Sequence, residues 1–315
     1  MVYWLAAVSS LVLSALFVPM FRKLALRLGF VDRPTKRKIH NKPIPLMGGT
    51  AIYLSCSLAI LAFLGLQPLS ITIVAGGGAL VLTGLLDDAF KSKGKDFPVW
   101  PRIIVYAAVA AFPLLFDIVI MGIRNPASGV YINFPDWSSA IATFIWIFAL
   151  INMINFIDGV DGLASGVCTM AATTLLIAAL VKGQNDTALV AASLAGASIG
   201  FLAYNFYPAR IFMGDAGATF LGYTLAVVAV DGAFKKATFI TVLVPLLALG
   251  VPIMDTAIVM TRRLLSGKGL HVADKMHTHH ALMRWGLNQV QTVSFLYLIA
   301  ALFSLLSLLL LLTTG

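Results

Sequence analysis

The chain has 315 residues, of which 60% are hydrophobic and 11% carry a formal charge. Soluble globular domains have about a quarter charged residues, so the composition excludes that class and indicates a helical membrane protein. The formal net charge of +9 does not indicate nucleic-acid binding, because basic loops in membrane proteins set the topology and contact anionic headgroups. All thirteen acidic residues are Asp, whose short carboxylate suits tight turns and metal sites.

Long hydrophobic runs predict an all-α polytopic membrane protein with about ten transmembrane helices in a single domain, 1–315. A β-barrel would show short alternating segments instead. The predicted spans are 3–21, 44–65, 70–86, 101–121, 138–155, 163–181, 187–206, 216–232, 238–261 and 291–312. The eighth is short enough to be tilted or partly interfacial. The first lacks a basic region before it and a cleavage site after it, so we expect it to be retained.

The basic residues predict the topology. Of the 22 Lys and Arg residues, all but four lie in alternate connections between the predicted spans. The positive-inside rule therefore places those connections in the cytoplasm and both termini outside. Among the outside connections, 122–137 contains the alternating stretch V-Y-I-N-F, which predicts a small extracytoplasmic hairpin. Cys56 and Cys168 lie in apolar runs and predict neither a metal site nor a disulfide.

The first polar motif on the predicted cytoplasmic side is the basic loop 32–49. Its prolines forbid a regular helix, and Arg37 and His40 are among the side chains that could bind phosphate. The alternative is an anchor on lipid headgroups. Gly48 and Gly49 at the head of the second span predict a close approach of backbones.

The second motif closes the third span with Asp87, Asp88 and Lys91. Adjacent carboxylates repel each other, so they favour a bound cation or a shared proton. The alternative is a solvated helix end, although Asp is unfavourable at a helix C-terminus.

The third motif, at 152–166, combines Asn152 and Asn155 with Asp158 and Asp161. Residues three apart share one face of a helical turn, while Gly159 and Gly162 are expected to break the helix and admit a ligand. Polar groups beside hydrocarbon are costly and usually functional. The segment therefore predicts a site for a metal ion and a phosphorylated ligand, with a structural turn as the alternative.

The fourth motif is the segment 205–217, in which Pro208 ends the seventh span and Gly214 precedes Asp215 at the start of the eighth. Asp215 is either a helix cap or a metal ligand at a helix N-terminus, where free N–H groups would face phosphate. Its neighbours in the sequence favour the metal ligand.

The fifth motif contains His277, His279 and His280. A zinc site would need more widely spaced ligands, so an anion-binding loop is favoured over zinc. Asp255, inside the ninth span, is expected to pair with a basic neighbour such as Arg262 or Arg263.

Together the motifs place carboxylates, glycines, basic residues and histidines at one membrane face. A transporter would instead carry its polar groups near the midplane. The combination is typical of Mg²⁺-assisted phosphoryl transfer to an amphiphile, because carboxylates and substrate phosphates complete the shell of a hard cation.

Five motifs in the same order resemble the polyprenyl-phosphate N-acetylhexosamine-1-phosphate transferase family over nearly the whole chain. They are R-K-I-H-N-K-P-I-P (37–45), L-D-D (86–88), N-x-x-N-x-x-D-G-x-D-G-L-A (152–164), N-F-Y-P-A-R-I-F-M-G-D-A-G (205–217) and H-T-H-H (277–280). The resemblance implies that a polyprenyl phosphate attacks a UDP-sugar, releasing UMP and forming a polyprenyl-diphosphate sugar. It implies Mg²⁺, with Mn²⁺ as the other candidate metal, and a multi-pass enzyme of the bacterial inner membrane with a cytoplasmic active site.

The resemblance also implies roles for individual residues. Asp215 corresponds to the principal metal ligand, with Asp87 and Asp158 as further candidates, and Asp87 or Asp88 corresponds to the base. Asp158 and Asp161 belong to the catalytic cluster. The residues implied in substrate binding are Asn152, Asn155, Asn205, Arg37, His40, Lys91, Gly214, His277, His279 and His280.

The R-K-I-H and H-x-H-H motifs favour the branch that uses UDP-N-acetylglucosamine and undecaprenyl phosphate, which starts envelope glycopolymers such as teichoic acid or O-antigen. The lipid I branch and a non-enzymatic lipid transporter are the alternatives. A CDP-alcohol phosphotransferase would need Arg and Asp residues that the sixth predicted span lacks. Relatives of this kind are often dimers, so a homodimer is one expectation.

Overall fold

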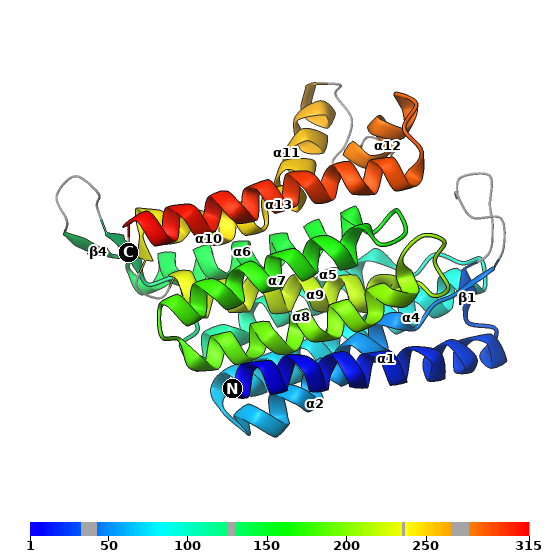
Figure 1. The fold of residues 1–315 in the computed structure, drawn as a ribbon, viewed down its shortest axis with the longest axis horizontal. Coiled ribbons are helices and arrows are strands. Elements are labelled where there is room, and N and C mark those ends of the chain that lie inside the picture. The colour runs from blue at the N-terminus through cyan, green and yellow to red at the C-terminus, as the bar shows by residue number, and fades with distance from the viewer. Residues whose placement is uncertain (33–42, 125–129, 235–236, 266–276, 315) are drawn as a thin grey trace.

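The computed structural model describes residues 1–32, 43–124, 130–234, 237–265 and 277–314. Its long helices lie side by side in one bundle, and both termini lie at the same end of the molecule (Figure 1). The elements of the first half are α1 (Val2–Leu28), β1 (Val31–Asp32), β2 (Ile44–Pro45), α2 (Gly48–Leu64), α3 (Pro68–Ile71), η1 (Thr72–Gly76), α4 (Gly77–Ser92), α5 (Val99–Ala111), η2 (Phe112–Phe116), β3 (Gly122–Arg124), β4 (Tyr131–Asn133) and α6 (Asp136–Ile157). Those of the second half are α7 (Leu163–Val181), α8 (Asn185–Asn205), α9 (Gly214–Ala229), η3 (Val230–Phe234), β5 (Ala237–Thr238), α10 (Phe239–Ala248), α11 (Gly250–Leu265), α12 (Thr278–Arg284) and α13 (Gln289–Thr314).

The predicted class, an all-α polytopic membrane protein, is confirmed. Among the described residues, seven helical segments are long and apolar enough to cross a membrane, or eight if the bent pair α10–α11 is one span. Each of the ten predicted spans coincides with a helix or with consecutive helices. This count takes helices of at least 18 residues. It therefore leaves out α2, which has 17 residues, and α9, which has 16.

Helix α9 lies in the centre of the bundle, packed against α2, α4, α6 and α7. Every residue from Ala216 to Ala229 is buried. The eighth predicted span is therefore covered by protein along its whole length from Ala216 to Ala229. A helix that is apolar on all sides is stable where neighbouring helices cover every face, and in α9 both Gly and Ala let those neighbours approach closely.

The ninth predicted span is not a single straight helix. Helices α10 and α11 meet at an angle of 73°, and α11 turns away from the direction of the long helices (Figure 1). Gly250 and Pro252 lie in the first turn of α11, where proline is tolerated because the N–H that it lacks has no helical partner. Within α11, Asp255 is buried and lies beside the start of α12.

Two small sheets lie at opposite ends of the bundle (Figure 1). Strands β3 and β4 pair antiparallel from Gly122 opposite Asn133, which confirms the predicted hairpin, and β5 pairs parallel with β3. At the other end β1 pairs with β2, and Leu46 continues into a parallel bridge with Phe212. This second sheet links the start of α2 to the segment before α9. Cys56 and Cys168 are buried and unbonded.

Candidate active site

The end of α4 lies directly beside the start of α9 because residue 84 is a glycine. A Cβ at this position would collide with the backbone of Asp215 and Ala216. Helix α4 continues to Ser92, so Asp87 and Asp88 lie inside the helix with exposed fractions of only 2% and 1%. They are therefore not a solvated helix end. The predicted close approach of Gly48 and Gly49 is also confirmed, because both donate backbone hydrogen bonds to the segment before α9, at 3.0 and 2.9 Å.

Two cations bridge the carboxylates of Asp87 and Asp215. The Lys91 Nζ lies 3.1 Å from Asp87 Oδ2 and 2.8 Å from Asp215 Oδ2. The Arg102 Nη1 lies 3.0 Å from the same Asp87 oxygen and 3.6 Å from the same Asp215 oxygen. Such pairing offsets the cost of burying the two acids. The sequence prediction missed Arg102, because its charge was counted only toward topology, although it follows the Asp87–Asp88 motif by one short connection.

Asp88 contacts the first residues of α9. Its Oδ1 accepts a hydrogen bond of 3.3 Å from the Asp215 N–H, one of the donors that a helix N-terminus leaves without a helical partner. Its Oδ2 is buried without a hydrogen-bond partner in the described part of the chain. This oxygen faces Gly214, where any side chain would collide with it. The alternative role of Asp215 as a helix cap is excluded, because Asp215 lies inside α9 and Met213 occupies the cap position.

The turn between α6 and α7 forms the next wall. Asp158 follows the last residue of α6, and Gly162 has a φ of +79°, which ends the turn and starts α7. Burial, followed by the negative charge of Asp215, raises the pKa of the Asp158 carboxyl to about 7. This carboxyl can therefore release or take up a proton near neutral pH.

Asp161 and Asn205 bind this turn to the segment between α8 and α9. The Asp161 Oδ2 accepts a hydrogen bond of 2.9 Å from the Ala209 N–H. The Asn205 Oδ1 accepts from the Gly162 N–H at 3.1 Å and from Ser165 Oγ at 2.9 Å, and its Nδ2 donates to the Ile211 carbonyl at 3.0 Å. Both side chains therefore hold the walls of the site together. This role was not predicted for either residue.

These segments surround a cleft with a volume of about 860 Å³. The predicted site residues that line it are Asp88, Lys91, Asp158, Asp161, Asn205, Gly214, Asp215 and His280. Asp87 lies behind Lys91 and is not among the lining residues. The cleft is also lined by Arg22, Arg210 and Gln289, which were not predicted. Of these, Arg210 could have been predicted as a site residue, because it lies within the fourth motif.

The structure does not bring every predicted binding residue to the cleft. Asn152 and Asn155 are not among the described residues that line it, and the Asn152 Nδ2 donates to the Phe148 carbonyl of its own helix at 2.7 Å. Arg37 and His40 lie outside the described residues.

The three histidines lie in different surroundings. His280 lines the cleft. The His279 ring is only 2% exposed and packs against Gly159, where a Cβ would lie 2.7 Å from the His279 Nε2. Burial, together with the neighbouring His280 and His277, lowers the pKa of His279 to about 3, so this imidazole is neutral. The His277 Nδ1 lies 2.7 Å from Asp255 Oδ2. The basic neighbour of Asp255 is therefore the His277 imidazole, and not Arg262 or Arg263 as expected.

The donor chemistry of the cleft suits a hard cation. Asp88, Asp158 and Asp215 offer only carboxylate oxygens, which Mg²⁺ prefers, and one oxygen of Asp88 has no hydrogen-bond partner among the described residues. In the same part of the chain, no three His, Cys, Asp or Glu side chains are already arranged around a common metal position. The ammonium group of Lys91 lies against the Asp215 carboxylate. A metal ion at Asp215 would therefore have to share this carboxylate with Lys91 or displace the ammonium group.

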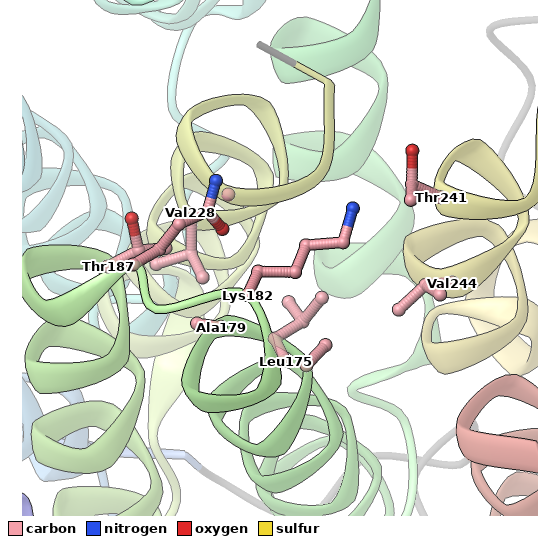
Figure 2. Close-up of a pocket in the computed structure, with 10 residues that line it drawn as sticks. Leu175, Ala179, Lys182, Thr187, Val228, Thr241 and Val244 are labelled. Atoms are coloured by element: carbon pink, nitrogen blue, oxygen red, sulfur yellow. The ribbon is translucent and has the colours of Figure 1, made fainter. Parts of the chain in front are cut away.

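A smaller cavity, drawn in Figure 2, lies beside the C-terminal end of α7, whereas the cleft lies beside its N-terminal end. Its volume is about 10 Å³, space for about one water molecule. The side chain of Lys182 points into it between Thr187 on one side and Thr241 on the other (Figure 2). Its size excludes a nucleotide or lipid, so the cleft beside α4 and α9 is the candidate active site.

The fold and the cleft define a polytopic membrane protein with a carboxylate-lined site at one end of a helical bundle. A model of the glycosyl transferase family 4 matches residues 69–233, which is about half of the chain and includes all the cleft carboxylates except Asp32. The chain belongs to this family. The match confirms the family resemblance that the five sequence motifs indicated.

Curated relatives extend the match over most of the chain. A probable undecaprenyl-phosphate N-acetylglucosaminyl 1-phosphate transferase of Bacillus subtilis is 32% identical, covering 95% of this chain and 82% of that protein. The undecaprenyl-phosphate alpha-N-acetylglucosaminyl 1-phosphate transferase of Escherichia coli is 29% identical, covering 94% and 80%. A decaprenyl-phosphate N-acetylglucosaminephosphotransferase of Mycolicibacterium smegmatis is 30% identical, covering 88% and 74%.

Proposed function

We propose that this protein transfers N-acetylglucosamine-1-phosphate from a UDP-sugar to undecaprenyl phosphate and releases UMP, which starts a cell-envelope glycopolymer. The relatives are named for transfer of this sugar phosphate to a polyprenyl phosphate. The observation that carries the proposal is the cleft of about 860 Å³, which brings Asp88, Lys91, Asp158 and Asp215 together from three separate segments.

In the proposed reaction an oxygen of the lipid phosphate attacks the sugar-bearing phosphorus of the nucleotide sugar. The bond from that phosphorus to the oxygen bridging the diphosphate breaks, and UMP leaves. The ammonium group of Lys91 lies at the cleft wall and would stabilise negative charge on the transferring group. Asp88 is the better candidate of the adjacent pair for orienting the nucleophile or accepting its proton, because it lines the cleft and Asp87 does not.

We include Mg²⁺ in the proposal, with Mn²⁺ as an alternative metal. Asp215 and Asp158 line the cleft and are the first candidates to hold it, and Asp87 would join them only after Lys91 and Arg102 moved. When bound, the metal would neutralise charge on the phosphoryl oxygens. Lys91 and the metal would then share the Asp215 carboxylate.

The proposed topology has ten spans, with the cleft at the cytoplasmic face of a bacterial inner membrane and both termini outside. The supporting observation is that the termini lie together at the end of the bundle opposite β1 and α12 (Figure 1). Arg22, Lys91 and Arg210, which line the cleft, belong to the connections that the positive-inside rule assigns to the cytoplasm. A homodimer remains part of the proposal because relatives of this kind are often dimers.

The test uses purified protein with UDP-N-acetylglucosamine, undecaprenyl phosphate and Mg²⁺. We expect UMP release that requires the lipid and disappears on addition of EDTA. Activity only with UDP-N-acetylmuramoyl-pentapeptide would show that the substrate assignment is wrong and would favour lipid I synthesis. Movement of lipid without UMP release would instead indicate a transporter.

A further inference from the structure

Asp255 is a buried carboxylate that makes two short contacts with a segment 22 residues further along the chain. Its exposed fraction is 3%. Its Oδ2 lies 2.7 Å from the His277 Nδ1, and its Oδ1 accepts a hydrogen bond of 2.6 Å from the Thr278 N–H. Both oxygens therefore bind the residues at which α12 begins. None of the functional roles assigned to the cleft residues involves Asp255.

Helix α12 connects the Asp255 contacts with the cleft through a series of histidine rings. The His277 and His279 rings lie 5.7 Å apart and almost parallel, at 7°. The His279 ring in turn packs on Gly159, in the turn that carries Asp158 and Asp161, and lies 4.3 Å from the His280 ring. His280 is the member of this series that lines the cleft. A displacement of α12 at Asp255 would therefore move His280 at the wall of the cleft.

The two sides of the cleft differ in chemistry. On one side α1 contributes Arg22 and Leu26, which is 48% exposed; this combination suits the phosphate and apolar chain of an amphiphile. On the other side lie His280 and Gln289, which offer only polar groups. Helices α1 and α12 lie on opposite sides of the bundle (Figure 1). The histidine side therefore suits the polar substrate.

We propose that Asp255 is a positioning residue for the nucleotide sugar, acting through His277 and Thr278 to hold α12 so that His280 forms its side of the cleft. This inference rests on the proposed function. It assigns α12 to the nucleotide sugar and leaves the polyprenyl phosphate to the α1 side. Removal of the Asp255 charge should therefore weaken one substrate and spare the other.

The test compares Asp255→Asn and His277→Gln with the wild-type protein. The dissociation constant for UDP-N-acetylglucosamine is measured by titration calorimetry, and KM for both substrates from UMP release. We expect each variant to raise the dissociation constant and KM for the nucleotide sugar about tenfold, the effect of losing about one charge-assisted hydrogen bond. KM for undecaprenyl phosphate should change by less than about twofold.

The double variant shows whether the two residues act through one contact. Its KM for the nucleotide sugar should be no more than about twofold above that of the weaker-binding single variant, because coupled residues are not additive. The matched control is Asp231→Asn. Asp231 accepts a hydrogen bond of 2.6 Å from Thr187 Oγ1 but lies just beyond the end of α9 that is distant from the cleft, so its KM values should equal those of the wild type.

The inference would be overturned by unchanged nucleotide-sugar affinity in folded Asp255→Asn, or by an equal rise in KM for both substrates. If Asp255→Asn does not fold, unchanged affinity in His277→Gln refutes the proposal on its own. A wild-type protein that binds the nucleotide sugar but releases no UMP would refute the proposed reaction, while the binding measurements would still decide the role of Asp255. A wild-type protein that does not bind it would refute the inference itself.

Discussion

Substitution of Gly84 by alanine should separate the carboxylates of α4 from those of α9. Of the three backbone atoms nearest to the added Cβ, the most distant, the Asp215 carbonyl carbon, would lie only 2.7 Å away, whereas ordinary contact begins at 3.4 Å. Because these atoms belong to a backbone buried on all sides, the two helices must move apart by on the order of 1 Å. Such overpacking typically costs about 1–3 kcal/mol of stability.

The effect on activity should exceed the effect on stability. The Asp88 Oδ1 bond to the Asp215 N–H and the Lys91 bridge both cross this contact. A misplacement of about 1 Å can lower turnover about a hundredfold, so we expect UMP release to fall by about that factor while the protein still purifies as a folded species. Turnover is measured beside a thermal unfolding curve.

Gly78→Ala in the same helix is the matched control. Its Cβ would approach only a side chain, with the Tyr53 hydroxyl oxygen at 2.8 Å, and no backbone atom of another helix. The gain in helix propensity, about 1 kcal/mol, is the same in both variants. Turnover of Gly84→Ala within about twofold of the wild type would contradict the reasoning. An equal loss in Gly78→Ala would contradict it as well.

Three further changes test the cleft. Asp215→Asn should abolish UMP release while the protein still purifies as a folded species, because it removes the carboxylate that faces both Lys91 and the cleft; near wild-type turnover would refute its metal role. Lys91→Met should lower turnover at least about tenfold, because it removes the one of the two bridging cations that lines the cleft among the described residues. The substitution Lys93→Met at an exposed neighbour should not; equal effects would show that only net charge matters. Asp158→Asn should stabilise the metal-free protein more at pH 8 than at pH 5. The raised pKa of Asp158, about 7 against an ordinary 3.8, means that its contribution to stability declines as the pH rises through this range. Unfolding temperatures in EDTA at the two pH values provide the check, and a constant difference between the variant and the wild type would contradict the pKa assignment.

Much of the architecture could be predicted because each hydrophobic run forms its own helix, and the period and length of such runs are local properties. The grouping of Asp88, Asp158 and Asp215 at one end was predictable for a related reason. An even number of crossings separates their loops, so topology alone places them on the same side. The hairpin at 122–137 was also local in origin.

The features that escaped prediction depend on contacts between distant segments. The bend of 73° between α10 and α11 lies within one continuous hydrophobic run, although Gly250 and Pro252 mark its place. The pairing of Asp255 with His277 crosses a connection of the chain and carries no periodic signal. From the sequence, Arg102 was interpreted only as a basic residue that sets the topology, and Asn205 only as a residue that binds the substrate. Their partners, Asp87 and the turn before α7, are visible only in three dimensions.

The central position of α9 has a consequence for the assembly of the protein during synthesis. Its first residues require Gly49 of α2 and Gly84 of α4 as neighbours, while its middle packs against α6. All three of these helices precede α9 in the chain and leave the ribosome first. The final packing of these earlier helices therefore requires a helix that is synthesised after them. A nascent chain that ends before Gly214 would contain Asp87, Asp88 and Lys91 but not Asp215, so the group of cleft carboxylates is complete only after α9 inserts between its neighbours.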